Sequence, residues 1–576
     1  MSKETLYIRQ LIDRMTLEQK IGALLTLGFS GTVPGPHIYE YITKYHCGGL
    51  RLSCDGRLFG NYVDPRKGNT VVTLENDSGI RFTQAPPTPT ASQFKAVLGD
   101  LQRVARARPL GLPLHFSYDQ EGGTSADFAF GGINIFPKPM GLRATGDPAV
   151  AYQVGRAVAE QSRAVGFNWI HSPVLDVNTD PRNPEIYTRA YSDQAEEVAE
   201  YAAESCRGLA EGGLIATAKH FPGRGHSDVD AHFQVPVIDV DRETMLAREL
   251  LPYRALIEKG LLPSIMLAHS IFPAFDPDDI STVSRKIITG LLRETLGFDG
   301  VITTDSMTMG AIASRYGVAN ACAMSLEAGA DLVLMKAENS LVPETIAAIR
   351  EAVEAGRIPM AALDKKVQRV LGVKYAYGLF APEREIVPED VIGRADIRAL
   401  AEDVGRRSVL IARDEARLLP LPASKTVLVI EQKVKHFNTF DWHSGILFEQ
   451  CARLGGTRVR YLETDYTYDE EDVLRIQAAM DRADIIVATN YYIRGKLCNR
   501  DFWAEQIKHT TKPVIIVTNT PYEALSIPHN AGTVVVTFST GPANIRATAG
   551  TLFGTVHPEG QWPLQTPLGS SRGGKA

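Results

Sequence analysis

The sequence has no hydrophobic run long enough to cross a membrane. A spanning helix needs about 20 consecutive apolar residues, and no run even of about 18 occurs in the chain. The first residues, MSKETLYIRQLIDRMTLEQK, also lack the continuous apolar segment and the small-residue cleavage site of a secretory signal. We therefore expect a cytoplasmic protein without a membrane partner.

Cysteine is scarce and irregularly spaced. No two cysteines form a C-x-x-C pair; the six are Cys47, Cys54, Cys206, Cys322, Cys451 and Cys498. Disulfide frameworks are typical of short secreted chains. In a chain of 576 residues we predict reduced, buried thiols instead.

Neither sign of charge dominates. The chain has 61 Lys and Arg residues against 67 Asp and Glu residues, a net charge of −6. It therefore lacks the basic excess that nucleic acids and anionic membranes attract, and we expect no nucleic-acid partner. With 44 % hydrophobic and 22 % charged residues, the composition is that of a globular protein with a full core. Small neutral or acidic molecules remain as ligands.

A strand-then-helix rhythm runs through roughly the first 370 residues. Six apolar runs end abruptly in polar residues: LPLHFSYDQEGG, FNWIHSPVLDVN, LIATAKHFPGRG, SIMLAHSIFP, GVITTDSMTMG and ADLVLMKAEN. Amphipathic segments such as DPAVAYQVGRAVAEQSRAVG and DQAEEVAEYAAESCRGLAEGG lie between them. This alternation predicts a parallel sheet, and a closed (β/α)8 barrel of the TIM type is the simplest closure; an open doubly wound sheet is the alternative.

The composition changes twice along the chain. Residues from about 50 to 90 are rich in Gly, Pro, Asn and Asp, which predicts a long inserted loop or hairpin. Prolines and charges then interrupt the helical pattern after residue 380, before the strand-like runs TVLVIEQ, DIIVATNYY, PVIIVTNT and TVVVTFST. We predict a barrel domain over 1–380, a linker over 381–400 and a smaller α/β sandwich domain over 401–576.

The stretch KHFPGRGHSDVDAH, residues 219–232, concentrates ionisable side chains around a glycine and proline hinge. His226, Asp230 and His232 are residue types that bind zinc. Zinc motifs normally hold their ligands on a regular helix or knuckle, however, and this segment predicts a flexible turn. A solvated polar loop is a second interpretation. We favour a third, in which Asp230 orients His232 for proton transfer, and we expect neither a metal nor a cofactor.

Two further motifs place carboxylates at strand ends. Asp305, in TTDSM, follows an apolar strand, so it should emerge at the same end of the barrel as residues 219–232. A purely structural carboxylate is the alternative. DQEGG, residues 119–123, sets two carboxylates against a tight turn, which suits the binding of sugar hydroxyls; a capped helix start is the alternative.

With these motifs in this order, the chain resembles glycoside hydrolase family 3, and specifically its β-N-acetylglucosaminidase branch. The resemblance covers nearly the whole length. Its motifs are MTLEQKIGALL, DQEGG, MGLRATGDP, SPVLDVN, KHFPGRG with DAH, LAHSIFP, LLRETLGFDGVITTDSM, EAGADLVLM, RRSVLIARDEARLLPL and LFGTVHPEGQWPL. Each motif is weak by itself, whereas their shared order is specific.

The resemblance implies a retaining mechanism. Asp305 attacks the anomeric carbon and forms a covalent glycosyl-enzyme. His232 protonates the leaving oxygen and later deprotonates the incoming water, while Asp230 holds its imidazole, so a His/Asp dyad replaces the usual carboxylic acid. The residues implied to bind the sugar are Asp119, Arg189, Lys219 and His220, with His269 near the same pocket.

Several residues depart from the family's usual pattern. Arg224 stands where His or Leu is usual, Ala231 where Ser or Thr is usual, and Thr124 replaces an Arg after DQEGG. Arg189 lies in YTRAYS instead of the commoner GxRSF. None of these changes removes a catalytic group, but they leave the substrate less well defined than the reaction.

The implied activity is release of terminal GlcNAc from short chitin- or peptidoglycan-derived saccharides. A phosphorylase or a β-glucosidase of the same family is the alternative among enzymes. A catalytically silent sugar-binding protein on the same fold is the alternative outside them. The sequence indicates no oligomeric state.

Overall fold

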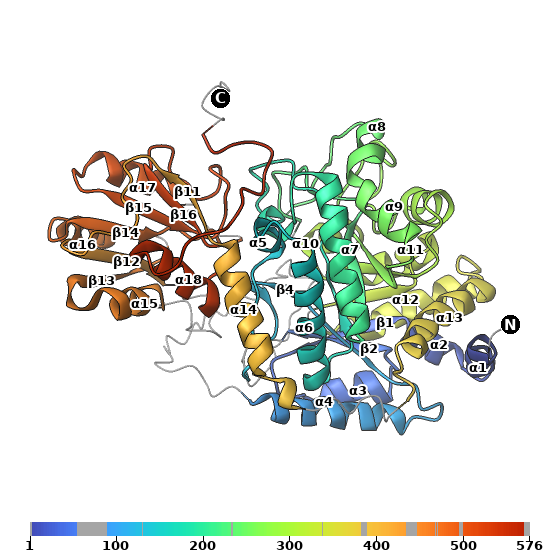
Figure 1. Cartoon of the computed structure of the whole chain (residues 1–576). Helices are drawn as coiled ribbons and strands as arrows, with labels where there is room; N and C mark the ends of the chain where they lie inside the picture. The colour runs from blue at the N-terminus through green and yellow to red at the C-terminus, as the bar shows by residue number, and fades with distance from the viewer. Residues whose placement is uncertain are drawn as a thin grey trace.

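The computed structural model describes residues 3–53, 89–129, 131–231, 234–336, 338–381, 389–433, 446–466, 468, 470–494 and 499–569. Their helices and strands form two bodies that lie side by side, a barrel and a smaller sheet domain (Figure 1). No helix among these residues is long and apolar enough to cross a membrane.

Parallel strands close the larger body into a barrel in the order β1-β10-β9-β8-β7-β6-β3-β2. The predicted (β/α)8 barrel is confirmed, and the open doubly wound sheet is excluded. The strands are β1 (Leu25–Ser30), β2 (Gly49–Ser53), β3 (His115–Tyr118), β6 (Trp169–Ile170), β7 (Ile215–Phe221), β8 (Ser264–Leu267), β9 (Val301–Ser306) and β10 (Leu332–Met335).

Helices that precede, connect and follow the strands cover the outside of the barrel (Figure 1). They include α1 (Lys3–Ile12), α2 (Leu17–Ala23), α3 (Pro36–Thr43), α4 (Ala91–Arg106), α5 (Pro139–Ala144), α6 (Ala149–Val165), α7 (Ala195–Glu211), α8 (Arg242–Thr244), α9 (Leu251–Glu258), α10 (Gly310–Tyr316), α11 (Val318–Ala328), α12 (Val342–Glu354) and α13 (Met360–Ala376). Wider π-type turns form Met245–Glu249 and Lys286–Thr295. The two amphipathic segments predicted from the sequence are α6 and α7.

Helices α6 and α7 pack closely because glycines face the partner helix. A Cβ atom at Gly208 of α7 would lie 2.2 Å from the Tyr152 carbonyl oxygen of α6. Helix α6 ends at Gly166, whose φ of 109° is left-handed. Glycine adopts this conformation without the steric penalty of a side chain, which explains where the helix stops.

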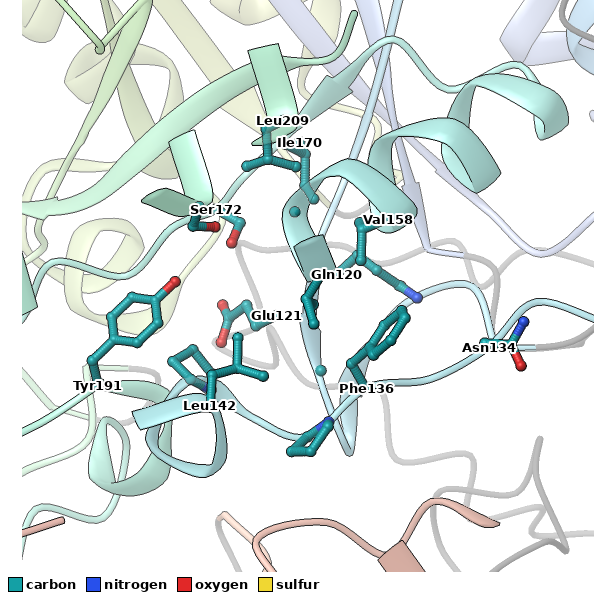
Figure 2. Close-up of a pocket in the computed structure, with 16 residues that line it drawn as sticks. Gln120, Glu121, Asn134, Phe136, Leu142, Val158, Ile170, Ser172, Tyr191 and Leu209 are labelled. Carbon is teal, nitrogen blue, oxygen red and sulfur yellow. The ribbon is translucent and has the colours of Figure 1, made fainter. Parts of the chain in front are cut away.

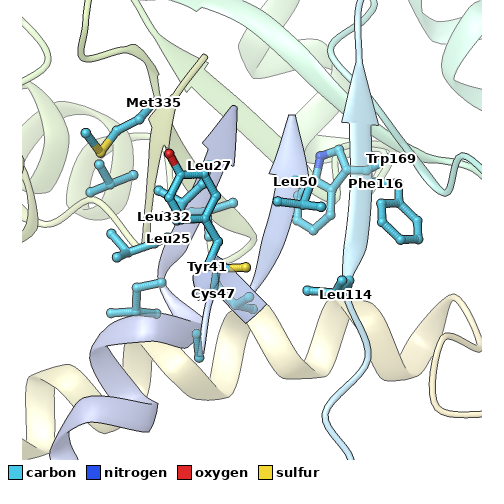
Figure 3. Packing of buried hydrophobic residues seen from close by; sticks show 14 of the residues in the cluster. Leu25, Leu27, Tyr41, Cys47, Leu50, Leu114, Phe116, Trp169, Leu332 and Met335 are labelled. Carbon is cyan, nitrogen blue, oxygen red and sulfur yellow. The ribbon is translucent and has the colours of Figure 1, made fainter. Parts of the chain in front are cut away.

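Large apolar side chains of the barrel strands are buried in the core of the larger body (Figure 3). Leu25, Leu50, Phe116 and Trp169 come from consecutive strands around the barrel and are all buried. The Trp169 indole donates a 2.6 Å hydrogen bond to Thr217 Oγ1. This bond satisfies the one polar atom that Trp169 takes into the core.

The first residues of the predicted insertion belong to the barrel. The segment 50–53 lies in β2, which pairs with β1 and β3, so the break in the barrel pattern begins after Ser53 and not at residue 50. Arg51 interrupts the apolar pattern of β2, and for this reason the strand was not predicted. The rest of the predicted insertion, residues 54–88, lies outside the described residues.

The smaller body is a six-stranded sheet in the order β11-β16-β15-β14-β12-β13, in which only the edge strand β11 is antiparallel to its neighbour. The four runs named as strands are β12, β14, β15 and β16; β11 and β13 complete the sheet. The strands are β11 (Leu410–Asp414), β12 (Val427–Lys433), β13 (Val459–Asp465), β14 (Ile485–Thr489), β15 (Val514–Thr518) and β16 (Thr533–Val536).

Helices cover both faces of this sheet, as a sandwich requires. Val427 and Val429 of β12 pack with α15 (Ile446–Gly455) and α18 (Pro542–Phe553). Leu428 and Ile430 face the opposite side, toward α16 (Glu470–Met480) and α17 (Arg500–Lys508). Helix α14 (Ala395–Ser408) begins within the predicted linker 381–400 and packs on α5 of the barrel and on α18. The predicted domain boundaries stay predictions.

Cysteines behave as predicted where the structure describes them. Cys47, Cys206, Cys322 and Cys451 are buried and unpaired. Burial raises the pKa of Cys47 to about 11, which keeps this thiol protonated and unreactive at neutral pH. Cys54 and Cys498 lie outside the described residues.

Truncation of a barrel leucine tests the core. We expect Leu50→Ala to lower the free energy of unfolding by about 2–5 kcal/mol, because Leu50 is 0 % exposed and its loss leaves a cavity. Leu6→Ala is the control, because Leu6 is 50 % exposed and should change stability by less than about 0.5 kcal/mol. Denaturant titration measures both variants, and equal losses would contradict the placement of Leu50.

Candidate active site

The predicted site residues lie at the carboxyl ends of the barrel strands. Asp119 directly follows β3, Lys219 and His220 belong to β7, and Asp305 belongs to β9. His269 follows β8 by two residues. Since the carboxyl ends of a parallel barrel meet on one face, side chains from distant parts of the chain come together there.

The remaining predicted residues lie on loops at the same face. Arg189 ends a short 3-10 helix, Tyr187–Arg189, in the loop after β6. Asp230 lies in the loop after β7. His232, the predicted acid/base, and its neighbour Phe233 lie outside the described residues.

Basic side chains surround Asp119. Lys219 Nζ lies 2.8 Å from Asp119 Oδ1, and Arg51 binds Oδ2. Lys336 Nζ lies 3.7 Å from Oδ2, and His171 Nδ1 lies 3.8 Å from Oδ1. Burial acts to raise the pKa of Asp119, but these neighbours outweigh it and hold the pKa well below its usual range. Asp119 is therefore a permanent carboxylate that can accept hydrogen bonds from sugar hydroxyls.

Glu121 is the second carboxylate of DQEGG, and it joins two cations in the interior of the site. Arg189 donates to it twice, at 2.7 Å from Nε and 2.9 Å from Nη2. Lys219 Nζ lies 2.5 Å from Glu121 Oε1. Burial opposes ionisation, yet Arg189 and Lys219 lower the pKa of Glu121 to about 2. The three side chains form a buried ion-pair network that fixes Arg189 and Lys219 in place.

His220 is held as a neutral imidazole. Its Nδ1 lies 2.7 Å from Asp176 Oδ2. Burial, aided by the charges of Arg224, Arg189 and Lys219, lowers the pKa of His220 well below its usual range. Burial also raises the pKa of Asp176 to about 6, against the effect of Arg224. The bond to Asp176 fixes the orientation of the His220 ring through Nδ1.

Arg224 connects the predicted nucleophile to a second buried carboxylate. Its Nη2 lies 2.8 Å from Glu185 Oε1 and 3.7 Å from Asp305 Oδ2. The Asp305 side chain is 16 % exposed, so a substrate can reach it. Its Oδ1 accepts a 2.7 Å hydrogen bond from the Ser306 amide. Arg224 therefore places a guanidinium cation beside the Asp305 carboxylate.

His269 supports the strand that carries Asp305. Its Nε2 donates a 2.9 Å hydrogen bond to the Ser306 carbonyl oxygen, and its Nδ1 lies 2.7 Å from Thr282 Oγ1. Both ring nitrogens thus have protein partners, and the side chain is buried. The geometry favours a positioning role for His269 over direct contact with the sugar.

Several side chains of the site were not selected from the sequence. Each lies in a barrel strand, directly after one, or in the loop after β6; they are Arg51, His171, Asp176, Glu185 and Lys336. His171 and Lys336 directly or closely follow apolar runs, so their place at a strand end was the available signal. Arg51 lies inside β2, where the apparent insertion concealed the strand. Nothing local marked Glu185.

A small cavity lies beside Glu121 (Figure 2). Its volume is about 30 Å³, and its walls include Phe136, Leu142, Ser172 and Tyr191. This is room for a water molecule or two, not for a sugar ring. The cavity therefore lies beside the ion-pair network and is not the substrate site.

Comparison with known proteins agrees with this geometry. The sequence profile of the glycosyl hydrolase family 3 N terminal domain matches residues 16–373. The chain belongs to glycosyl hydrolase family 3. In this family 3 glycoside hydrolase, the matched segment contains all barrel strands and every predicted site residue.

Relatives of this family 3 enzyme match most of its length. Beta-hexosaminidase A of Pseudoalteromonas piscicida is 25 % identical over 507 residues, 83 % of this chain and 79 % of the relative. The beta-N-acetylglucosaminidase/beta-glucosidase of Cellulomonas fimi is 26 % identical, over 84 % of this chain and 88 % of the relative. A solved family 3 beta-N-acetylglucosaminidase from Paenibacillus sp. strain FPU-7 is 29 % identical with a TM-score of 0.82, over 96 % of this chain and 99 % of that one.

Replacement of Glu121 tests the ion-pair network. We expect Glu121→Gln to lower the free energy of unfolding by about 3–5 kcal/mol at pH 7, because it leaves buried Arg189 and Lys219 without their shared counterion. The folded-state pKa of Glu121, about 2, lies below its ordinary value of 4.5. Its stabilisation is therefore complete above pH 4.5 and is lost as the pH falls toward 2.

The measurement is denaturant unfolding of parent and variant at about pH 7 and about pH 3.5, with exposed Glu196→Gln as the control. The difference between parent and Glu121→Gln should shrink at the lower pH. A difference that stays constant would show that ionised Glu121 does not stabilise the fold.

Proposed function

We propose that this enzyme is a retaining exo-β-N-acetylglucosaminidase that removes terminal β-linked GlcNAc from short chitin- or peptidoglycan-derived saccharides. The observation that carries the proposal is the position of Asp305 on the site face, beside the cation Arg224 and in a barrel whose sugar-facing groups match the family motifs. The names of the relatives, beta-hexosaminidase and beta-N-acetylglucosaminidase, support the sugar named in the proposal, and the source of the saccharides is an expectation from the sequence.

The first chemical step is attack by Asp305 on the anomeric carbon. The bond to the leaving oxygen breaks as the covalent glycosyl-aspartate forms, and the leaving oxygen takes a proton from His232, held by Asp230. The second step reverses these roles: His232 removes a proton from water, which displaces Asp305 and regenerates the carboxylate. Two inversions at one carbon give overall retention.

Charged side chains that are held by protein partners bind the terminal sugar. Asp119 is ionised and accepts hydrogen bonds, whereas Lys219 and Arg189 donate them. Neutral His220 contributes Nε2. Because these groups are held by protein partners before the substrate arrives, little conformational freedom is lost on binding.

A panel of aryl β-glycosides tests the proposal, using GlcNAc, GalNAc, glucose and xylose with and without phosphate. We expect GlcNAc glycosides to react fastest, with free GlcNAc as the product and β-GlcNAc as the first anomer formed. Asp305→Ala serves as the control for background hydrolysis and should lower kcat by a factor on the order of 10⁴ or more.

Other outcomes of the panel identify the alternatives. Sugar 1-phosphate as the main product indicates a phosphorylase, and preference for glucosides indicates a β-glucosidase. No turnover of any glycoside indicates a silent sugar-binding protein. An α-anomer formed first would overturn the retaining mechanism.

Removal of the acid/base separates substrates by their leaving groups. We expect His232→Ala to lower kcat/KM on a GlcNAc disaccharide by about 10²–10⁴-fold, the usual contribution of a general acid. A dinitrophenyl GlcNAc glycoside should be nearly unaffected, because its leaving group departs without a proton. Steady-state kinetics on both substrates measure this, and equal losses on the two would refute the assignment of His232.

A further inference from the structure

We propose that the second domain positions the acid/base loop of the barrel, and that Glu185 is the residue through which it acts. This assigns a role to a domain that supplies none of the predicted catalytic groups. The catalytic part of the test rests on the proposed function; the structural part does not.

The loop after β6 forms hydrogen bonds with the first part of the segment 222–231, which we call the acid/base loop. The Asp176 carboxylate accepts a 2.8 Å hydrogen bond from the Arg224 amide through Oδ1, while its Oδ2 pairs with His220. Asn183 Nδ2 donates to the carbonyl oxygens of Arg224 and Gly225, at 3.1 Å each. These polar groups are buried, so their hydrogen bonds leave little freedom to shift.

The two segments also touch backbone to backbone. A Cβ atom at Gly225 would lie 1.8 Å from the Val177 carbonyl oxygen. Only glycine allows this approach, and any movement of the segment near Val177 therefore moves the acid/base loop with it.

Glu185 binds the end of the acid/base loop. Its Oε2 accepts a 3.2 Å hydrogen bond from the Ala231 amide, and its Oε1 forms the ion pair with Arg224. Ala231 is the residue between Asp230 and His232 in the chain. One buried carboxylate thus binds both the backbone amide next to Asp230 and the cation beside Asp305.

The second domain contacts this carboxylate and its neighbours directly. Arg494 Nη1 lies 3.9 Å from Glu185 Oε1. Tyr492 donates a 2.8 Å hydrogen bond to the Pro184 carbonyl oxygen, and its ring packs at 5.1 Å on that of Tyr187. Both second-domain residues follow β14. One short segment of that domain therefore contacts the chain on both sides of Glu185, at Pro184 and at Tyr187.

The charge of Arg494 acts on the Glu185 carboxylate together with the charges of two other arginines. Glu185 Oε1 has three guanidinium groups within 4.0 Å, from Arg189, Arg224 and Arg494. Arg189 is also bound by Glu121 and Arg224 also faces Asp305. Arg494 is the cation that the second domain adds, and it biases where the Glu185 carboxylate lies between the other two.

The test uses the double variant Tyr492→Phe/Arg494→Met in the full chain. It removes the hydroxyl and the guanidinium but keeps the size of both side chains. The matched control is Tyr461→Phe/Arg482→Met in the same domain. Tyr461 forms a hydrogen bond with Glu463 of its own strand. Arg482 is exposed and lies before β14, whereas Arg494 lies after that strand. The control pair therefore lacks the barrel contacts described for the test pair.

Hydrogen–deuterium exchange gives the readout that needs no substrate. In the test variant, a peptide spanning residues 222–236 should exchange faster than in the parent and in the control variant, because the Ala231 amide loses its fixed acceptor. Unchanged exchange in that peptide overturns the proposal, whatever the enzyme's substrate proves to be.

Kinetics supply the second readout, as the ratio of kcat/KM on a poor and an activated leaving group. In the test variant, kcat/KM on a GlcNAc disaccharide should fall at least roughly five-fold more than on the dinitrophenyl glycoside, since only the former needs a well-placed acid. An equal fall on both substrates would point to substrate binding or general destabilisation and would overturn the positioning role. If the parent hydrolyses no GlcNAc glycoside, the proposed function fails, and the exchange result still decides this inference.

Discussion

The buried ion pairs of Glu121 with Arg189 and Lys219 hold together the face of the barrel on which the site is built. Their side chains come from the short strand β4 (Gln120–Gly122) that follows β3, from the loop after β6 and from strand β7. Charges this deeply buried are tolerated only when each has a partner of opposite sign. The three segments are therefore held in fixed positions relative to one another, and so are the predicted site residues that they carry.

From this network, charge of alternating sign extends outward in two directions. On one side, Lys219 also binds Asp119, which Arg51 and Lys336 approach from other strands. On the other side, Glu185 pairs with Arg224, and Arg224 lies near Asp305. The proposed sugar-binding residues and the proposed nucleophile thus belong to one connected electrostatic system, and a change of charge at either end alters the field at the other.

Much of the barrel could be predicted because its signals are local. Each of six strands is an apolar run that stops at polar residues, and helices α6 and α7 show a clear apolar face. Strand β2 escaped prediction because Arg51 breaks its apolar pattern, although this arginine is buried against Asp119 and Asp127. A polar residue inside a strand looks like a loop until its partner, far away in the chain, is known.

The sequence by itself determined the fold class, the site face and several of the groups that meet there, among them Asp119, Lys219 and Asp305, because the strand ends of a parallel barrel converge on one face. Only the tertiary structure decided how those groups divide the work. Arg224 had no assignable purpose in sequence, and its position between Glu185 and Asp305 supplies one. Glu185 carried no signal at all, since its importance depends on partners 39 to 309 residues away, and pairings between distant side chains are set by packing and charge in three dimensions and leave no local pattern.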